Sequence, residues 1–506
     1  MNRTAIALAA AVAALAAVTG FAVVAAPSDG ATPQQAAARL PVERSSLVCP
    51  VPSTSDLAET SYTAFTPAGK GGGGAGGAQL LPSVSGPGTD AKKGGKGKPG
   101  KGGTADTKKP VVSLKEPGKP VVDEESGGDT PALIGSADGP LAPGWTVQQT
   151  TTVDVGGSRG VLGTNCTAPD TDFWFPGAST AASRQDYVHL TNPDDSAAVA
   201  DIELYGKGGA VKSGVGEGIT VPARSTVPVL LSTLTPDPAE NLTVHVSTRS
   251  GRVGAVVQSM DNKLGSDWLP ASTAPSRRLV LPGIPADATS VRLVALAPGS
   301  DDVDLKVQLA GPDGTIVPAG NETLHLKAGM TGSADLGDVT KGAAGSLVLS
   351  QTGGSRAPVV AALRVVRGKG SKQEVAFIPA TAPVGGRASV ADNRAKGSVL
   401  SLAAPGATAK VHVTSSAGSG GGTKTVKEYT VKGGTTLAVK PTPPPGLKGS
   451  YALTVEPEAG SGEVYAARTL ELPQDGVPMF TVQTLPDDRG TVSVPRARQD
   501  LSLLDD

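Results

Sequence analysis

Aromatic residues and cysteines are scarce in this sequence. Phe, Trp and Tyr make up 3% of the 506 residues, and there are two cysteines. A core with so little aromatic bulk must be built from Val, Leu, Ile and Ala, which is typical of short strands rather than of a large enzyme core. An even pair of cysteines suits a single disulfide in an oxidising compartment, and we predict a bridge between Cys49 and Cys166.

Strong net charge is also missing. The formal net charge is −1 and the isoelectric point is near 6.5, so the chain as a whole has no electrostatic attraction for nucleic acid. Sixty-seven glycines and 42 prolines favour many turns and at least one unfolded segment over long helices.

The N-terminus contains a long uncharged stretch. Residues 5–26 carry no charge and are long enough as a helix to cross a hydrocarbon layer of about 30 Å, with Arg3 placing the N-terminus inside. We predict a signal-anchor or signal peptide helix over 1–26 and a short tether over 27–40. Pro27 disfavours cleavage after Ala26, so both membrane attachment and secretion stay open. In either case the rest of the chain is exported.

Residues 67–131 differ in composition from their surroundings. They are rich in Lys and Gly and poor in apolar residues, so they cannot offset the entropy of ordering, and we predict a disordered low-complexity insertion. Its lysines form a flexible polycation that could hold an anionic wall polymer or lipid headgroups, or simply be a solvated spacer. No aromatic residue lies between them, which argues against nucleic acid. The candidate contact residues are Lys92, Lys93, Lys96, Lys98 and Lys101.

Beyond the insertion the sequence repeats. Three segments of similar pattern can be aligned with a spacing of about 105 residues, which predicts tandem copies of one structural unit. We place repeat 1 at 172–272, repeat 2 at 273–370 and repeat 3 at 371–472. The aligned positions include Pro193, Pro298 and Pro405, and Val221, Leu326 and Val431.

Each repeat contains about seven short runs of alternating apolar and polar residues, bounded by Gly, Pro, Asn or Asp. Such runs predict strands with one buried face. Their number and spacing predict an all-β fold of tandem immunoglobulin-like β-sandwiches. Residues 41–66 and 132–171 contain weaker versions of the opening and closing strands, so we expect a degraded β unit there. Residues 473–506 are expected to form a terminal hairpin and tail.

An aromatic cluster, Phe173, Trp174 and Phe175, opens repeat 1. The positions equivalent to Phe175 are Leu281 and Ile378, which favours an ordinary first strand that packs into its own sandwich. An exposed Trp174 that stacks on a sugar ring or a partner is the alternative.

No arrangement typical of catalysis is found. Ser158 lies in a G-x-S-x-G pattern, but the following residues lack the helical pattern that a nucleophile elbow needs. The histidines alternate with apolar neighbours, are expected to point outward from four different strands, and show no metal-ligand spacing. We therefore predict no catalytic, cofactor-binding or metal-binding residues. The four histidines are His189, His245, His325 and His412.

Several segments resemble an uncharacterised family of exported actinobacterial proteins, domain of unknown function 5719. They are "ARLPVERSSLVCP", "LAPGWTVQQTTTV", "CTAPDTDFWFPGAS" and "QTLPDDRGTVSVPRA". The resemblance implies a location in the cell envelope of a high-GC Gram-positive bacterium and carries over no catalytic residues.

The combined features favour a non-enzymatic cell-envelope protein whose sandwiches serve interaction or scaffolding. Its expected partner is a wall glycopolymer or an envelope protein. An envelope hydrolase with a carboxylate site between modules and an accessory subunit of an envelope-assembly complex are the alternatives. The sequence gives no oligomeric state.

Overall fold

The computed structural model describes residues 38–69, 75–84, 108–354 and 356–494. The chain divides into a small unit, 1–40 with 491–506, and a large unit, 41–490. In the small unit the described residues pair β1 (Ala38–Pro41) with β36 (Thr491–Val494). The predicted helix over 1–26 lies outside the described residues, as does the tether up to residue 37. Within the part that is described, no helix has the length and apolarity needed to cross a membrane.

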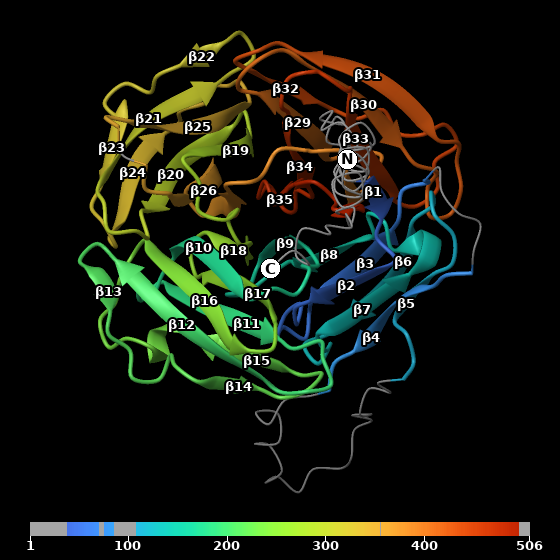
Figure 1. Ribbon diagram of the computed structural model, residues 1–506, viewed down its shortest axis with the longest axis horizontal. Helices are drawn as coiled ribbons and strands as arrows, with labels where there is room; N and C mark the ends of the chain where they lie inside the picture. Colours follow the sequence, from blue (N-terminus) through green and yellow to red (C-terminus); the bar gives the residue numbers. More distant parts are fainter. Residues whose placement is uncertain (1–37, 70–74, 85–107, 355, 495–506) are drawn as a thin grey trace, which may run out of the picture. The chain divides into compact units, whose positions relative to one another are not determined.

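The large unit consists of eight antiparallel sheets that form four sandwiches, numbered here in chain order (Figure 1). Short 3₁₀ turns occur at Gly139–Leu141 and Leu231–Thr233, and the described residues include no α-helix. Sandwich 1 contains β2 (Arg44–Cys49), β3 (Glu59–Phe65), β4 (Ala78–Pro82), β5 (Val112–Leu114), β6 (Val121–Ser126), β7 (Leu133–Asp138), β8 (Thr146–Val153) and β9 (Gly160–Asn165).

Sandwiches 2 and 3 follow with one additional short strand each. Sandwich 2 contains β10 (Asp172–Ala178), β11 (Arg184–Thr191), β12 (Ala198–Gly206), β13 (Gly209–Val211), β14 (Ile219–Val221), β15 (Thr226–Leu230), β16 (Leu242–Ser250), β17 (Gly254–Asp261) and β18 (Gly265–Leu269). Sandwich 3 contains β19 (Arg278–Ile284), β20 (Ala288–Leu296), β21 (Val303–Ala310), β22 (Thr315–Ile316), β23 (Thr323–Leu326), β24 (Thr331–Gly337), β25 (Gly345–Thr352), β26 (Val360–Lys369) and β27 (Lys372–Pro379).

Sandwich 4 completes the set. It contains β28 (Ala388–Asn393), β29 (Ser398–Ala404), β30 (Ala409–Ser415), β31 (Thr425–Val431), β32 (Thr435–Val439), β33 (Tyr451–Pro457), β34 (Tyr465–Glu471) and β35 (Phe480–Thr484). The last strand, β35, pairs with β34, whereas β36 pairs with β1. The predicted terminal hairpin is therefore wrong, because the two strands around residues 485–490 belong to different sheets.

All four sandwiches share one strand order. With β13–β14 and β22–β23 each counted as a divided fourth strand, one sheet has the order 1-6-3-4 and the other the order 5-2-7-8. In an immunoglobulin sandwich the first strand pairs with the second. Here it pairs with the sixth. The all-β prediction is confirmed, but the strand order is not immunoglobulin-like, because alternation identifies strands and not their neighbours.

Sandwich 1 is complete rather than degraded. It has the same eight strands in the same order as the others, and a continuous buried cluster fills it. Three of its strands, β4, β5 and β6, come from the segment predicted as a disordered insertion. Short apolar runs such as "AQLLP" and "VSL" alternate into the core there, and the surrounding glycines and lysines concealed them.

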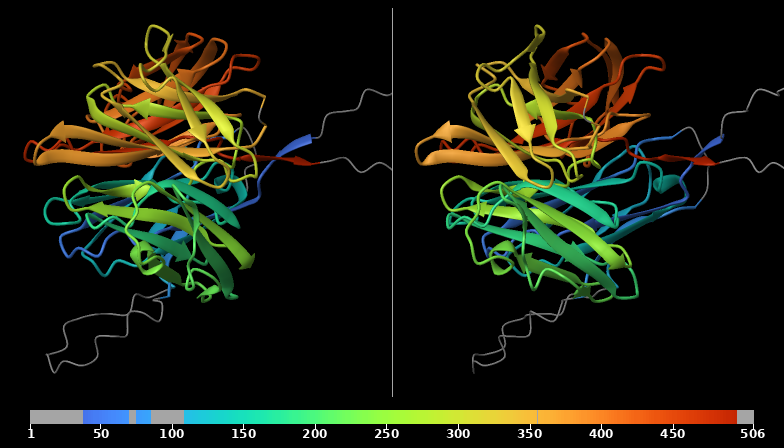
Figure 2. Two further views of the ribbon diagram at one scale, coloured as in Figure 1. Left: turned by 90° about the vertical axis from the view of Figure 1, so that its left-hand side faces the viewer. Right: turned by 60° about the vertical axis from the view of Figure 1, so that its left-hand side comes forward.

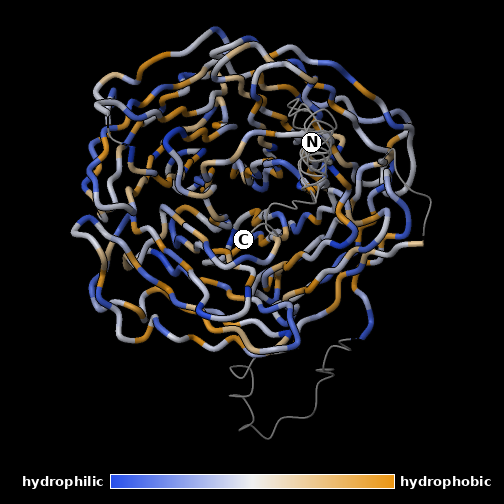
Figure 3. Tube along the Cα trace, viewed as in Figure 1, coloured by the Kyte–Doolittle hydropathy of each residue, from blue (hydrophilic) through white to orange (hydrophobic). Residues whose placement is uncertain are grey.

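Alternating side chains build each core as expected. In β21, Val303, Leu305 and Val307 are buried while the residues between them are more exposed. Similar clusters lie between the sheets of every sandwich, and hydrophobic residues are accordingly spread over all four (Figure 3).

The four sandwiches of the large unit form a closed ring (Figure 1). The first strand of one sandwich packs on the second and seventh strands of the next, as β10 does on β20 and β26, and β19 on β29 and β34. The last strands β9, β18, β27 and β35 contact one another in a cycle. In the side views, sandwiches 1 and 2 lie below sandwiches 3 and 4 (Figure 2).

Candidate functional site

The ring closes where β28 of sandwich 4 packs on β3 and β8 of sandwich 1. We call this contact the closing interface. Its middle is apolar, with Phe65, Ala391 and Ala452 in one buried cluster. Its two ends are polar: Arg387 precedes β28 at one end and Arg394 follows it at the other.

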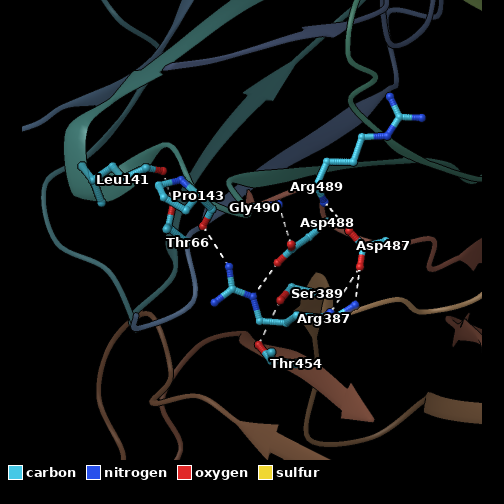
Figure 4. Close-up of polar contacts among 11 residues, drawn as sticks. Thr66, Leu141, Pro143, Arg387, Ser389, Thr454, Asp487, Asp488, Arg489 and Gly490 are labelled. Atoms are coloured by element: carbon cyan, nitrogen blue, oxygen red, sulfur yellow. Dashed lines mark hydrogen bonds and ion pairs between the residues drawn. The ribbon is translucent and has the colours of Figure 1, made fainter. Parts of the chain in front are cut away.

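At the first end, Arg387 joins three segments that are distant in sequence (Figure 4). Its Nε donates to Asp488 Oδ2 at 2.5 Å and its Nη2 donates to the Pro143 carbonyl oxygen at 3.1 Å. Burial raises the pKa of the Asp488 carboxyl, while Arg387 acts against this rise. Gly144 has a φ of 76°, and a Cβ there would collide with the Asp488 carboxylate. Glycine at this position therefore permits the close approach.

The neighbouring Asp487 binds backbone groups instead. Its Oδ2 accepts a hydrogen bond from the Gly386 N–H at 2.5 Å, and its Oδ1 accepts one from the Arg489 N–H at 2.8 Å. Ser389 and Thr454 share a hydroxyl hydrogen bond of 3.0 Å nearby (Figure 4). Arg387, Asp487 and Asp488 are thus all hydrogen-bonded within the protein, which gives this end of the closing interface a structural role.

The second end opens into a groove of about 320 Å³ between sandwiches 1 and 4. We call it the polar groove. Its lining residues have in common a carboxylate, a hydroxyl or a guanidinium group, and none is aromatic or aliphatic. They are Glu59, Glu124, Glu125, Thr60, Ser61, Ser126, Thr150, Thr152 and Arg394.

Strand register places most of these groups on one face of the sheet. Ser61 on β3 lies opposite Glu124 on β6 and Thr150 on β8. One step along, Glu59 lies opposite Ser126 and Thr152. Because residues two apart on a strand share a face, two rows of polar side chains run side by side across the floor of the groove.

Two residues distinguish the groove from an ordinary polar surface. Thr150 is 2% exposed, and its Oγ1 has no hydrogen-bond partner among the described residues. A buried hydroxyl without a partner costs free energy, so a ligand oxygen or nitrogen there would remove that cost. Arg394 is held by the buried Asp392 through hydrogen bonds of 3.2 and 3.3 Å.

The charges of the lining decide which ligands it suits. Three carboxylates face one guanidinium, so the groove carries net negative charge and repels phosphate and carboxylate groups. Ligands that donate hydrogen bonds, such as sugar hydroxyls and amines, match its many acceptor oxygens.

Comparison with known proteins gives one family. The model of DUF5719, a family of unknown function, matches residues 121–442. The chain belongs to this family. The matched region of this DUF5719 member runs from β6 into sandwich 4, and so includes every residue of the polar groove except Glu59, Thr60 and Ser61. No match was found among the curated proteins.

The predicted disulfide of this DUF5719 protein is present. Cys49 at the end of β2 and Cys166 just after β9 are bridged, with Cα atoms 4.4 Å apart. The bridge is compatible with an extracytoplasmic location.

Trp174 does not provide an exposed contact. It is 8% exposed, stacks on His245 with ring centroids 3.8 Å apart, and donates to Asp172 Oδ1 at 2.9 Å. It also packs with Leu296 and Val360 of sandwich 3. The surface interpretation is therefore wrong, because the face of β10 that points away from its own core is covered by the next sandwich.

The other predicted residues have mixed outcomes. The five candidate lysines lie outside the described residues. Ser158 lies in a turn before β9, as expected for a hairpin. His189 points away from the core of its sandwich, as expected, but it is buried at 5% exposure, and burial lowers its pKa to about 4.

No groove residue of this DUF5719 member was predicted from the sequence. The available signal was the polar stretch "QQTTT" at 148–152, which has hydroxyl or amide groups on both strand faces. A strand with two polar faces cannot pack only against an apolar core, so one face must meet polar groups or solvent.

Proposed function

We propose that this protein is a non-enzymatic, extracytoplasmic scaffold of the cell envelope that binds a hydroxyl-rich wall glycopolymer in the polar groove. Residues 1–26 would attach it to the membrane, or direct its secretion if they are cleaved. The observation that carries the proposal is the groove itself, which is lined by carboxylates and hydroxyls and includes the Thr150 hydroxyl, a group with no hydrogen-bond partner among the described residues.

The ligand class follows from the donors and acceptors of the lining. Sugar hydroxyls both donate and accept, and so pair with carboxylates and with threonine and serine hydroxyls alike. The net negative lining favours a neutral or amine-bearing polymer over one rich in phosphate. Preformed sites lose less conformational entropy on binding, and the disulfide-bridged sandwich 1 supplies a rigid floor.

Retention on purified wall fractions tests the proposal. Full-length protein should bind wall glycopolymer, and Glu124→Gln or Thr150→Val should weaken binding by roughly tenfold, since each removes a hydrogen bond to the ligand. Glu116→Gln is the matched control, because Glu116 is exposed and outside the groove. Equal binding by wild type and both groove variants would reject the groove as the site. Recovery of an envelope protein instead of polymer would redirect the proposal to a protein partner.

A second candidate function rests on the carboxylates. Glu59 and Glu124 lie on paired strands of the same groove, and two nearby carboxyl groups are the usual machinery of glycoside hydrolysis. The same wall fractions can be assayed for new reducing ends. Release of reducing ends that is lost in Glu124→Gln would make the protein a hydrolase and not a scaffold.

A further inference from the structure

The outer face of sandwich 4 brings a histidine among glutamates. His412 on β30 lies directly opposite Glu428 on β31 and Glu456 on β33. His412 alternates with the buried Val411 and Val413, so its ring points away from the core. A third glutamate, Glu458, lies just beyond β33, and its N–H donates to the Lys410 carbonyl oxygen at 2.9 Å.

The donor atoms of three of these residues converge. One atom each from His412, Glu428 and Glu458 lies within 4.8 Å of the other two. His412 Nε2 and Glu458 Oε1 are 3.3 Å apart. Ligands bound to Zn²⁺ at about 2.0–2.1 Å in tetrahedral geometry are themselves roughly 3.3 Å apart, so this pair already has the separation that the ion requires.

Other outward histidines are engaged differently. Both ring nitrogens of His245 have a carboxylate oxygen at 2.8 Å, and His325 Nδ1 lies 2.8 Å from Asp304 Oδ1. Those distances are typical of direct hydrogen bonds. At His412 the carboxylate of Glu458 is 3.3 Å from the ring nitrogen, beyond the usual hydrogen-bond distance, and a second carboxylate, that of Glu428, converges on the same point.

We propose that His412, Glu428 and Glu458 bind a divalent transition-metal ion, with Zn²⁺ as the best match. Zn²⁺ accepts both imidazole nitrogen and carboxylate oxygen as ligands, whereas Ca²⁺ and Mg²⁺ prefer oxygen ligands alone. The donors come from three neighbouring parts of one hydrogen-bonded sheet, which fixes their backbone positions. His412 and Glu458 are partly exposed, so water can supply the remaining ligands. This site is separate from the polar groove and does not depend on the proposed function.

Calorimetric titration of Zn²⁺ into metal-free, full-length protein tests the site. We expect one zinc ion per chain, with His412→Ala and Glu428→Gln each weakening binding by roughly tenfold or more, since even ligand-supporting residues have effects of that size. Substitution of Co²⁺ should give the visible absorption of a bound ion, lost in the same variants. His412 is partly exposed, so its replacement leaves the core intact, and thermal unfolding without metal checks this.

His325→Ala is the matched control, because it removes an outward histidine flanked by carboxylates on sandwich 3. Unchanged binding by this control with loss in His412→Ala supports the assignment. Absence of zinc binding by the wild type, undiminished binding by His412→Ala, or equal weakening in both histidine variants would overturn it.

Discussion

Replacing Glu374 by glutamine should change how the stability of the ring depends on pH. Glu374 lies on β27, one of the four strands that meet in the cycle of last strands, and its side chain is fully buried. Arg159 Nη2 donates to its Oε2 at 3.4 Å, and Oε1 has no hydrogen-bond partner among the described residues. Burial raises the pKa of this carboxyl from 4.5 to about 8, and the Arg159 charge only partly opposes the rise.

Proton linkage gives the direction in which stability changes with pH. Between the unfolded pKa and the folded pKa, the folded chain holds a proton that the unfolded chain releases. The contribution of Glu374 to stability is therefore complete below pH 4.5 and is lost as the pH rises through about 8. A difference of this size between the two pKa values corresponds to about 5 kcal/mol of unfolding free energy.

Urea unfolding of wild type and Glu374→Gln at about pH 5 and about pH 9 measures the titration of Glu374 together with that of the buried Asp267, whose pKa the Glu374 charge helps to raise. Titrations of groups distant from Glu374 cancel in the double difference. Glutamine keeps the shape and cannot ionise, and Arg159 retains its hydrogen bond to the Gln373 carbonyl oxygen. Between about pH 5 and about pH 9 the free energy of unfolding should fall for wild type by several kcal/mol more than for the variant. Glu116→Gln, on the surface, should match wild type. Parallel pH profiles for wild type and Glu374→Gln would refute the reasoning.

Two further predictions concern how the ring is held together. Replacing Cys49 and Cys166 by alanine removes a disulfide between positions 117 residues apart. The free energy of unfolding should fall, by at most about 5 kcal/mol from chain entropy. Urea unfolding identical to that of wild type would contradict this. Arg387→Ala leaves the mostly buried Asp488 carboxylate without its counter-charge, which should cost about 3 kcal/mol and speed amide hydrogen exchange in β28. Exchange equal to that of wild type would show that Arg387 does not hold the closing interface.

Periodicity predicted the strands but not their pairing. The alternation of Val303, Leu305 and Val307 shows which face is buried, and this is the same whichever strand lies beside β21. The order 1-6-3-4 and 5-2-7-8 depends on long-range connections that local patterns do not contain. The repeat period was informative because each copy supplies most of one buried cluster, to which the next sandwich adds a few residues in two cases.

Assignment of exposed faces failed for a different reason. His189 and Trp174 do point away from the core of sandwich 2, as alternation requires, yet both are buried. Part of the face that points away from the core of one sandwich is covered by a neighbouring sandwich, as Trp174 is by Leu296 and Val360. Alternation within a strand does not show whether a neighbouring sandwich covers the outward side chains. It also did not reveal β4, β5 and β6, because these short strands lie among glycine-rich and lysine-rich residues.

The interfaces around the ring differ in a way that explains where the groove lies. Between sandwiches 2 and 3, Trp174, Leu296 and Val360 fill the contact, and Val280 and Tyr465 are among the residues that fill the next one. Apolar contacts of this kind leave nothing for a polar ligand to bind.

The closing interface must instead join the first sandwich to the last, and it does so with a short apolar centre and a charged end at Arg387. Hydrogen bonds are directional, so the Arg387 contacts fix the distance and angle between sandwiches 1 and 4. At the opposite end of β28 the Thr150 hydroxyl lines the groove and has no hydrogen-bond partner among the described residues, and such a fixed polar group suits the preformed site that we propose.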